Sequence, residues 1–296
     1  MVISIIIPTY KNRGMLPRAV DSALNQIGAD VEVIVVDDNS PESDARKQTE
    51  AIMSHYEHDK RVKYIRHAEN RNGAAARNTG IRASKGEYIA FLDDDDFFLP
   101  EKVAKQVAYL KIHTDKDAVY CLAERDGRRY GSTTFEGDAT KHILMLETCM
   151  YTPCLMFRRN ALLAINGFDE GFRRHQDYDL LLRFFHAGYK IGCLREILTE
   201  IGTNEGENIP SGQKLEEMKA YFFEKFMPYI KEIEQEEPGF KNKVLAKHYG
   251  GVFLNHVKQK NFKMAWNTLG TYFPMSPATF YRVIKSSLMI HIKRSL

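Results

Sequence analysis

Four short runs of β-branched and aromatic residues constrain the fold more than any other feature of this sequence. They read VISIII at 2–7, VEVIVV at 31–36, VKYI at 62–65 and EYIAFL at 87–92. Most of these runs are apolar almost without interruption and too short to be buried helices, which is the pattern of strands covered on both faces. Strands of this kind form parallel sheets between layers of helices.

Helical patterns separate these runs. Apolar residues recur at helical spacing over 15–26, and GAAARNTGIRASKG predicts a second helix within 73–86. Pro100 is placed to start a further helix directly after the last run. Strands that alternate with helices of this length indicate βαβ units. We therefore expect an α/β protein with a Rossmann-like, mainly parallel sheet flanked by helices.

The pattern changes in the second half of the chain. A strand pair is predicted around Asp126-Gly127, followed by shorter helices and strands. The polar stretch TNEGENIPSGQK at 203–214 predicts a loop, which could be a lid over a bound ligand or a plain linker. Beyond it the sequence favours helices. We expect one domain over 1–205 and a helical C-terminal region over 206–296.

Charge is distributed unevenly along the chain. Residues 241–296 contain ten Lys and Arg and no Asp or Glu, whereas the rest of the chain is net acidic. A basic tail on an acidic body suggests an anionic partner surface. Apolar and basic side chains interleave over 279–296, which is compatible with reversible attachment to an anionic membrane. A solvated appendage or an oligomer contact is the alternative, and no nucleic-acid-binding module accompanies the basic residues.

Composition also sets expectations about the compartment. No run approaches 18 consecutive apolar residues and the opening MVISIIIPTY has no basic leader, so we expect neither a membrane-spanning helix nor a signal peptide. The four cysteines lack CxxC spacing and are expected to be free thiols in a reducing cytosol. We expect a cytoplasmic location. The basic tail suggests an alternative, which is peripheral attachment to the inner face of the cell membrane.

Acidic residues follow two of the predicted strands at the point where each strand ends. Asp37 and Asp38 follow the second run, and 93–96 is a row of four aspartates after the last run. Carboxyl ends of parallel strands lie at one edge of a sheet, so these acids and residues 8–10 should face one crevice. A single acid pair is more often a turn or a helix cap, but two pairs at equivalent strand ends favour a site.

Carboxylates gathered in this way need a positive counter-charge. Mg²⁺ or Mn²⁺ suits oxygen ligands, and such an ion held by one or two carboxylates usually takes other ligands from substrate phosphates. No cluster of His and Cys with zinc spacing competes with this interpretation. The residues alone therefore predict a phosphate-bearing ligand, such as a nucleotide.

Four separated motifs resemble the family 2 glycosyltransferases, in order and in spacing. They are SIIIPTYKNRGMLPRAVDSALNQ, VEVIVVDDNSPES, NRNGAAARNTGIRASKGEYIAFLDDDDFFLPEKV and HQDYDLLLRFFHAGYK. The resemblance covers roughly residues 1–200 and implies the GT-A fold with an inverting, nucleotide-sugar-dependent reaction. It further implies a nucleotide-binding half over 1–100 and an acceptor-binding half over 101–205.

The resemblance also implies roles for single residues. The positions that it assigns to the donor nucleotide are Pro8, Thr9, Tyr10, Asp38, Asn72, Gly73, Arg77, Asp93 and Asp94. Asp38 matches the acid that accepts a hydrogen bond from the base N3–H in members that use UDP, and Asp93 or Asp94 matches the acid that touches the ribose. Asp95 matches the ligand of a Mn²⁺ or Mg²⁺ ion. Asp96 is expected to cap the following segment or to support its neighbours.

The general base of the family matches Asp177, at the start of a predicted helix. The motif usually reads Glu-Asp, whereas this chain has Gln176 before the aspartate. Asp179 is the competing base, but on a helix it points roughly 200° away from Asp177. An acid stabilised by the helix dipole is the structural alternative for Asp177. His175 and the pair at 173–174 could contact phosphate or acceptor, or be ordinary surface residues.

The resemblance narrows the reaction and leaves the substrates open. Processive synthases of the family carry a QxxRW motif, which this sequence lacks, so a single addition to a glycan or lipid-linked glycan in surface polysaccharide synthesis is expected. UDP is the favoured nucleotide, with GDP and dTDP remaining open. The rival functions are a nucleotidyltransferase that makes activated sugars and a non-catalytic nucleotide-sugar-binding protein. Trp266, in the tail, is expected to be a packing residue.

Overall fold

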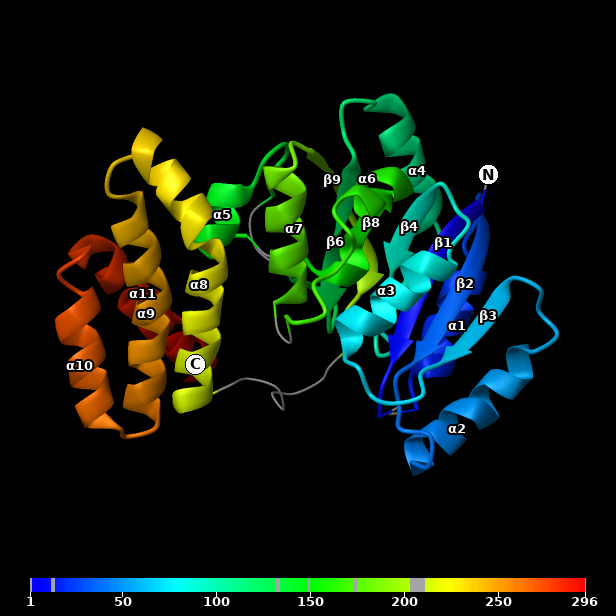
Figure 1. Cartoon of the computed structure of the whole chain (residues 1–296), viewed down its shortest axis with the longest axis horizontal. Helices are drawn as coiled ribbons and strands as arrows, with labels where there is room; N and C mark the ends of the chain where they lie inside the picture. The colour runs from blue at the N-terminus through cyan, green and yellow to red at the C-terminus, as the bar shows by residue number, and fades with distance from the viewer. Residues whose placement is uncertain are drawn as a thin grey trace. The chain divides into compact units, whose positions relative to one another are not determined.

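The computed structural model describes residues 2–11, 14–130, 134–148, 150–172, 175–202 and 211–295. The chain divides into two compact units (Figure 1). The first contains residues 1–140 and 148–205, and the second contains residues 141–147 and 206–296. The short segment 141–147 thus groups with the C-terminal helices, although it lies between residues of the first unit in the sequence. The predicted loop at 203–214 lies largely outside the described residues.

A nine-stranded sheet forms the first unit, and its N-terminal half is parallel as predicted. In spatial order the strands are β3 (Val62–Arg66), β2 (Asp30–Asp37), β1 (Val2–Thr9), β4 (Tyr88–Phe91), β8 (Leu155–Arg158), β6 (Ala118–Arg125), β9 (Ile191–Glu200) and β5 (Phe97–Phe98), with β7 (Arg128–Tyr130) paired to β6. The four strands from β3 to β4 are mutually parallel. Beyond β4 the sheet is mixed, because β8 runs antiparallel to both of its neighbours.

Helices cover both faces of this sheet, which confirms the predicted α/β architecture (Figure 1). They are α1 (Leu16–Leu24), α2 (Asp44–Met53), α3 (Gly73–Ala83), α4 (Lys102–Ile112), α6 (Arg159–Ala164) and α7 (Gln176–His186), with short 3₁₀ turns at Ser54–Tyr56 and Thr152–Cys154. Side chains alternate along β1, so Ile5 packs with α1 and α4 in the larger core cluster, while Ile6 faces α3. Gly80 allows this approach, since a Cβ there would lie 2.3 Å from Ile6 Cγ2.

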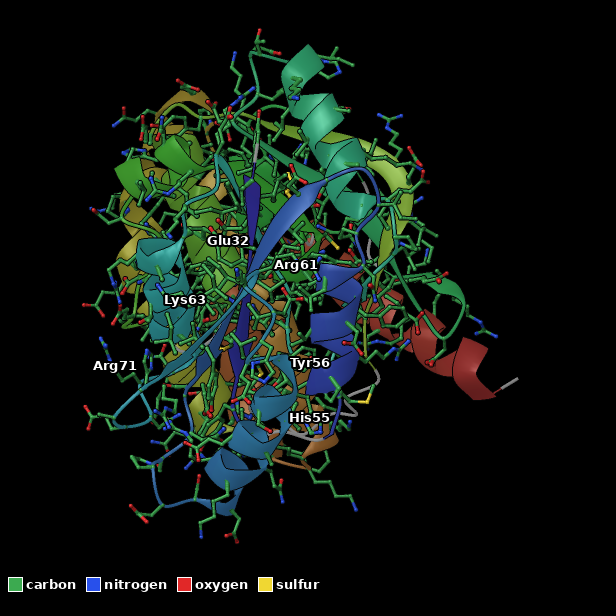
Figure 2. The ribbon with its side chains drawn as sticks, turned by 90° about the vertical axis from the view of Figure 1, so that its right-hand side faces the viewer. Glu32, His55, Tyr56, Arg61, Lys63 and Arg71 are labelled. Carbon is green, nitrogen blue, oxygen red and sulfur yellow. The ribbon has the colours of Figure 1, made fainter. Side chains whose placement is uncertain are left out.

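The sheet ends at β3 in a polar edge (Figure 2). Lys63, on β3, is exposed, and Arg61, just before it, pairs with Asp59 and donates 3.1 Å to the Leu24 carbonyl. Tyr56 Oη donates 2.8 Å to Asp21 on α1. Charged side chains on an edge strand disfavour pairing with another sheet.

Helices form the second unit over the residues that the structure describes, as the sequence predicted for its C-terminal part. They are α5 (Thr140–Leu144), α8 (Gln213–Glu236), α9 (Phe240–Lys258), α10 (Phe262–Tyr272) and α11 (Pro277–Ser295). Helix α9 is the centre of the group: Tyr249 stacks on Tyr272 of α10 at 3.7 Å, and Gly250 lies against Val283 of α11. Buried His248 Nε2 lies 2.8 Å from the Leu144 carbonyl, which ties the 141–147 segment to α9.

Two further expectations can be compared with this structure. Cys121, Cys154 and Cys193 are free and buried, as predicted, while Cys149 lies outside the described residues. Trp266 was expected to pack, and this expectation is wrong, because its side chain is 75% exposed. Among the described helices none combines the length and the apolar character needed to cross a membrane.

Candidate active site

The row of four aspartates forms a tight turn at the end of β4, and its members face different partners. Asp96 N donates 3.1 Å to the Asp93 carbonyl, which closes the turn. The Asp93 carboxylate is paired with the Arg77 guanidinium, and Asp94 accepts a 2.6 Å hydrogen bond from Thr9 Oγ1. Asp96 is buried and accepts a hydrogen bond from Gly202 N at 2.7 Å. Adjacent like charges are tolerated more easily here because the carboxylates of Asp93, Asp94 and Asp96 each have a separate partner.

Burial changes the protonation of two of these acids. The pKa of Asp94 is raised to about 7, mainly by burial and also by the charges of Asp95 and Asp93, while the hydrogen bond from the Thr9 hydroxyl opposes the rise. Burial likewise raises the pKa of Asp96 well above its usual range. The turn therefore carries fewer than four negative charges near neutral pH. Asp96 supports the turn, which was one of its two predicted roles.

The tips of β1 and β2 are joined to this turn. Asp38 N donates 2.9 Å to the Thr9 carbonyl, and the Thr9 hydroxyl reaches Asp94. Thr9 is fully buried, whereas Tyr10 beside it is 48% exposed and Pro8 is partly exposed. The three strand ends that the sequence placed at one edge thus meet through direct hydrogen bonds.

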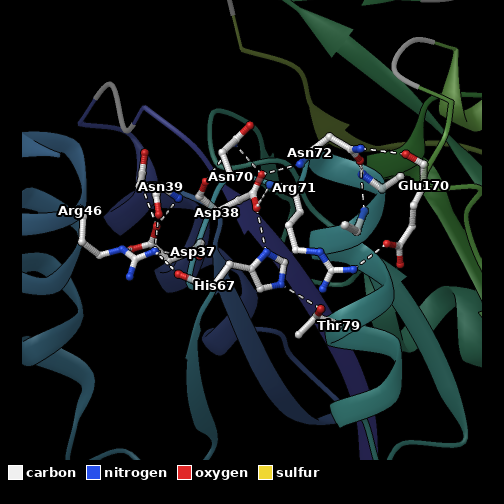
Figure 3. A network of polar contacts seen from close by, with 12 residues as sticks. Asp37, Asp38, Asn39, Arg46, His67, Asn70, Arg71, Asn72, Thr79 and Glu170 are labelled. Carbon is white, nitrogen blue, oxygen red and sulfur yellow. Dashed lines mark hydrogen bonds and ion pairs between the residues drawn. The ribbon is translucent and has the colours of Figure 1, made fainter. Parts of the chain in front are cut away.

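Asp38 occupies the centre of a polar network (Figure 3). Its Oδ1 lies 2.8 Å from Arg71 N and 2.8 Å from His67 Nδ1, and its Oδ2 lies 2.8 Å from both Asn70 Nδ2 and Asn72 N. A carboxylate offers about four acceptor positions, so hydrogen bonds from the protein itself occupy all acceptor positions of Asp38. In this structure Asp38 fixes the conformation of the turn at 70–72.

That turn starts helix α3. Asn72 has φ +91° and caps the helix, with its side-chain oxygen accepting from Ala74 N and Ala75 N. Its amide also donates 2.8 Å to the Glu170 carbonyl, which ties the turn to the segment before α7. The buried carboxylate of Asp37 is held similarly by Arg46, by Tyr64 Oη at 2.6 Å and by Asn39.

Arg77 connects α3 to the rest of the site. Its Nη2 pairs with Asp93, its Nη1 donates 2.8 Å to Gln176 Oε1, and its side chain is only 11% exposed. Gly73 leaves room for it, since a Cβ at Gly73 would stand 3.1 Å from Arg77 Nη1. One guanidinium therefore bridges the aspartate turn and the first residue of α7.

Asp177 follows Gln176 and projects into a pocket of about 370 Å³. Arg77, Asp93, Asp95, His175 and Gln176 line the same pocket. Burial raises the pKa of Asp177 to about 6, while the N–H of Tyr178 and the Arg77 charge oppose this rise. Asp177 is thus largely ionised at neutral pH and able to accept a proton. The competing base, Asp179, is buried and paired with Arg183 at 2.7 Å, so the helix geometry separates the two acids as expected.

The far wall of the pocket comes from the second half of the unit. Arg125 lies over the Tyr130 ring at 4.1 Å, and Tyr130 stacks on Tyr151 at 4.8 Å. These residues were not identified from the sequence. Arg125 and Tyr130 flank the predicted Asp126-Gly127 turn, so their position on a hairpin was the only signal. The predicted pair at 173–174 lies outside the described residues.

A family model agrees with this arrangement. The model described as glycosyl transferase family 2 matches residues 4–165, which is more than half of the chain. The chain belongs to this family. The predicted GT-A fold is likewise confirmed, and the matched region includes β1, β2, α3, the aspartate turn and β8.

Relatives with similar sequences carry names of the same kind. An uncharacterized glycosyltransferase of Haemophilus influenzae is 39% identical over 208 residues, covering 68% of this chain and 74% of the relative. A second one from that organism is 31% identical over 188 residues, covering 62% of this chain and 61% of the relative. One from Methanocaldococcus jannaschii is 27% identical over 228 residues, covering 75% and 77%. The chain thus spans between about three fifths and three quarters of these relatives' lengths.

Solved structures show the same fold. Residues 1–349 of S. aureus TarS, in complex with UDP-GlcNAc, match with a TM-score of 0.68 at 20% identity, covering 96% of this chain and 84% of that one. A longer TarS structure matches with a TM-score of 0.62 at 20% identity, covering 96% of this chain and half of that chain. At this identity the likeness concerns the fold.

The GT-A fold implies a divalent cation, and the carboxylates that line the pocket are compatible with one. Asp93 and Asp95 line the pocket with carboxylate oxygens, which Mg²⁺ and Mn²⁺ prefer. Within the described residues no group of three or more His, Cys, Asp or Glu side chains surrounds a common point. A cation would therefore rely on one or two of these carboxylates and complete its shell with phosphate and water oxygens.

Proposed function

We propose that this family 2 glycosyltransferase moves one sugar from a nucleotide diphosphate donor, a UDP-sugar, to a hydroxyl of a glycan or lipid-linked glycan, with inversion at the anomeric carbon. The biological setting that we propose is synthesis of a surface polysaccharide. The observation that carries the proposal is the pocket that holds Asp177, with its pKa near 6, beside Asp93, Asp95 and Arg77.

In the proposed reaction Asp177 is the general base. Its carboxylate accepts the proton of the acceptor hydroxyl while that oxygen bonds to the anomeric carbon, and the bond from this carbon to the diphosphate oxygen breaks with its electron pair on the diphosphate. A base with a pKa about one unit below neutral is ionised and still basic enough to help. Attack opposite to the leaving group inverts the carbon in one displacement, without a second carboxylate as nucleophile.

The leaving diphosphate gains negative charge, which two arginines that line the pocket can balance. Arg77 is held in place by Asp93 and Gln176, and Arg125 adds a second guanidinium. A bound Mn²⁺ or Mg²⁺ on Asp95 would supply further electrostatic stabilisation of the diphosphate. Fixed positive groups of this kind act most strongly in a pocket that excludes water.

The nucleoside is proposed to lie along Pro8, Thr9, Tyr10 and the Asn72-Gly73 turn. Support comes from TarS, which has this fold and was solved in complex with UDP-GlcNAc and with UDP. A base N3–H could reach Asp38 only by displacing one of its four donors. Asn70 is the donor best able to yield, since its amide also reaches the Asp38 carbonyl at 2.9 Å.

The test is Asp177→Asn in the full chain, with Asp115→Asn as the matched control, because Asp115 lies outside the pocket and is paired with Lys116. A panel of UDP-, GDP- and dTDP-sugars, with and without Mn²⁺, is first screened for nucleotide release and thermal stabilisation. On the active donor, Asp177→Asn should lower kcat about 10²- to 10⁴-fold and leave donor affinity within about twofold, while the control keeps full activity.

Three outcomes would contradict the proposal. Unchanged activity of Asp177→Asn would remove this residue as the base. Pyrophosphate release from a sugar phosphate and a nucleoside triphosphate would indicate a nucleotidyltransferase. Donor binding without turnover by the unmodified protein, across the panel and with acceptors present, would indicate a binding protein.

A further inference from the structure

Helix α10 of the second unit presents two large aromatic side chains to solvent. Phe262 is 67% exposed and Trp266 is 75% exposed. They are four residues apart, so they lie on the same face of the helix. Single exposed apolar residues are common on proteins, but adjacent exposed Phe and Trp side chains mark an interaction surface more often.

This face is distinct from the one that packs within the unit. Helix α10 turns buried Ala265 and Thr268 inward, and Tyr272 stacks on Tyr249 of α9. The apolar side of α11 is also used internally, since Phe280 is fully buried and packs on Phe253 and Phe273. Over the described part of the chain, Phe262 and Trp266 make no ring contact. The two exposed aromatic side chains therefore take no part in the packing of the helices.

Three lysines lie close to the aromatic pair in the sequence. Lys258 ends α9, Lys260 lies in the turn before α10, and Lys263 follows Phe262; all three are exposed. Within the described residues none of the three forms an ion pair, whereas Lys243 on the same helix as Lys258 pairs with Glu237 at 2.9 Å. Residues 241–296 contain no acid, and an acidic side chain that contacts this end of α9 is Glu216 of α8, whose Oε1 lies 2.6 Å from His256 Nε2.

We propose that this α10 surface, made by Phe262, Trp266, Lys258, Lys260 and Lys263, docks on an anionic phospholipid bilayer. Trp and Phe side chains partition into the boundary between headgroups and acyl chains, and lysines beside them are attracted by anionic headgroups. A second copy of the chain is a poorer occupant. A symmetric contact would bring six lysines together without an acid on this surface.

This inference places membrane contact on α10, whereas the sequence pattern had suggested the 279–296 segment as one of two alternatives. It does not depend on the proposed sugar transfer, because lipid binding can be measured without a donor or an acceptor. Docking would hold the protein at a surface where lipid-linked acceptors are present, but neither claim requires the other.

Trp266 is the only tryptophan in the chain, so its fluorescence reports directly on this surface. The full-length protein is titrated with vesicles of phosphatidylcholine containing phosphatidylglycerol, and with vesicles of pure phosphatidylcholine. The expected result is a blue shift of the emission and quenching by brominated acyl chains with the anionic vesicles only. Binding should weaken as salt is raised.

Vesicle co-sedimentation of variants supplies the second measurement. Lys258→Gln, Lys260→Gln and Lys263→Gln combined should weaken binding about hundredfold, from about fivefold for each charge, and Phe262→Ala should weaken it about tenfold. The matched controls remove equal charge and equal apolar area from the first unit, at exposed Lys60, Lys85 and Lys111 and at Ile112, which is 76% exposed. These controls should bind as the unmodified protein does.

Several results would overturn the inference. One is an emission spectrum that anionic vesicles leave unchanged. A second is equal weakening by the control variants, which would indicate a diffuse charge effect. A third is a blue shift that grows with protein concentration in the absence of lipid, which would identify the surface as a contact between copies.

Discussion

Replacing Gln176 by glutamate tests how Arg77 and Asp177 act together. The substitution is nearly isosteric and puts a carboxylate 2.8 Å from Arg77 Nη1, where an amide oxygen now accepts. The guanidinium would then be shared between the new carboxylate and Asp93. Both the added negative charge and the weaker influence of Arg77 disfavour the ionised form of Asp177. The pKa of Asp177 should therefore rise.

The magnitude follows from the position of the new charge. Carboxyl groups on adjacent residues in the first turn of a helix lie roughly 7 Å apart, and an effective dielectric constant of about 40 gives about 1.2 kcal/mol of repulsion. Since 1.36 kcal/mol corresponds to one pKa unit, we expect the pKa of Asp177 to move from about 6 to about 7. At neutral pH about half of the base would then be protonated.

The assay is the pH dependence of kcat/KM on the active donor. Activity requires ionised Asp177, so it falls on the acid side, and Gln176→Glu should move this limb upward by about one pH unit while the activity at pH 9 changes little. Gln48→Glu makes the same charge change at an exposed position of α2 and should leave the profile unchanged. An acid limb that stays in place, or moves downward, would refute the coupling between Arg77 and Asp177.

Three further predictions concern stability. The pKa of Asp177 is about 6 in the folded protein and near 3.8 in the unfolded chain, so ionisation of this carboxyl lowers the stability above pH 6 and has no effect below about pH 4. Asp177→Asn should therefore stabilise the fold by up to about 3 kcal/mol at pH 8. A gain of equal size at pH 3.5 would contradict this reasoning. Gly80→Ala should destabilise by about 2 to 4 kcal/mol, since the new methyl would overlap Ile6; a neutral effect in urea unfolding would show that α3 can move away. Burial lowers the pKa of the Lys102 ammonium, which donates a 2.7 Å hydrogen bond to the neutral Gln106 Oε1. Lys102→Met should therefore stabilise the fold by about 1 to 3 kcal/mol at pH 7, and a lower unfolding midpoint would argue that the ammonium is well compensated.

The sequence predicted most of what depends on local pattern. The parallel strands, the helices between them and the acids at their ends are encoded in short stretches, and the structure joins Thr9, Asp38 and Asp94 at one edge. The separation of Asp177 from Asp179 followed from helix periodicity alone. These features need only the position of a residue within its own element.

Features that depend on long-range pairing were not predictable. The bridge from Arg77 to Gln176 spans 99 residues, and four separate groups saturate Asp38, three of them from the turn at 70–72 and one from buried His67. No local sequence pattern predicts these hydrogen-bond partners. The insertion of antiparallel β8 beside β4 and the grouping of 141–147 with the C-terminal helices are likewise choices of tertiary packing.

Trp266 shows a different limit of sequence reasoning. Its size and apolar character predict burial, and the helical spacing of α10 does not say which of two apolar stripes faces α9. The smaller residues Ala265 and Thr268 occupy the packed face instead. The expectation of burial was wrong for Trp266, which is one of the residues proposed to contact a membrane.

The hydrogen bond from Gly202 to Asp96 has a consequence for protein engineering. Gly202 N supports the aspartate turn, and a Cβ at Gly202 would stand 2.3 Å from the Asp95 carbonyl, so no other residue fits there without displacing the turn. Gly202, two residues beyond the end of β9, is thus also a wall of the pocket. Chimeras that graft a different C-terminal region onto this catalytic unit should be joined after Gly202, because a junction placed even one residue earlier would replace a part of the active site together with the graft.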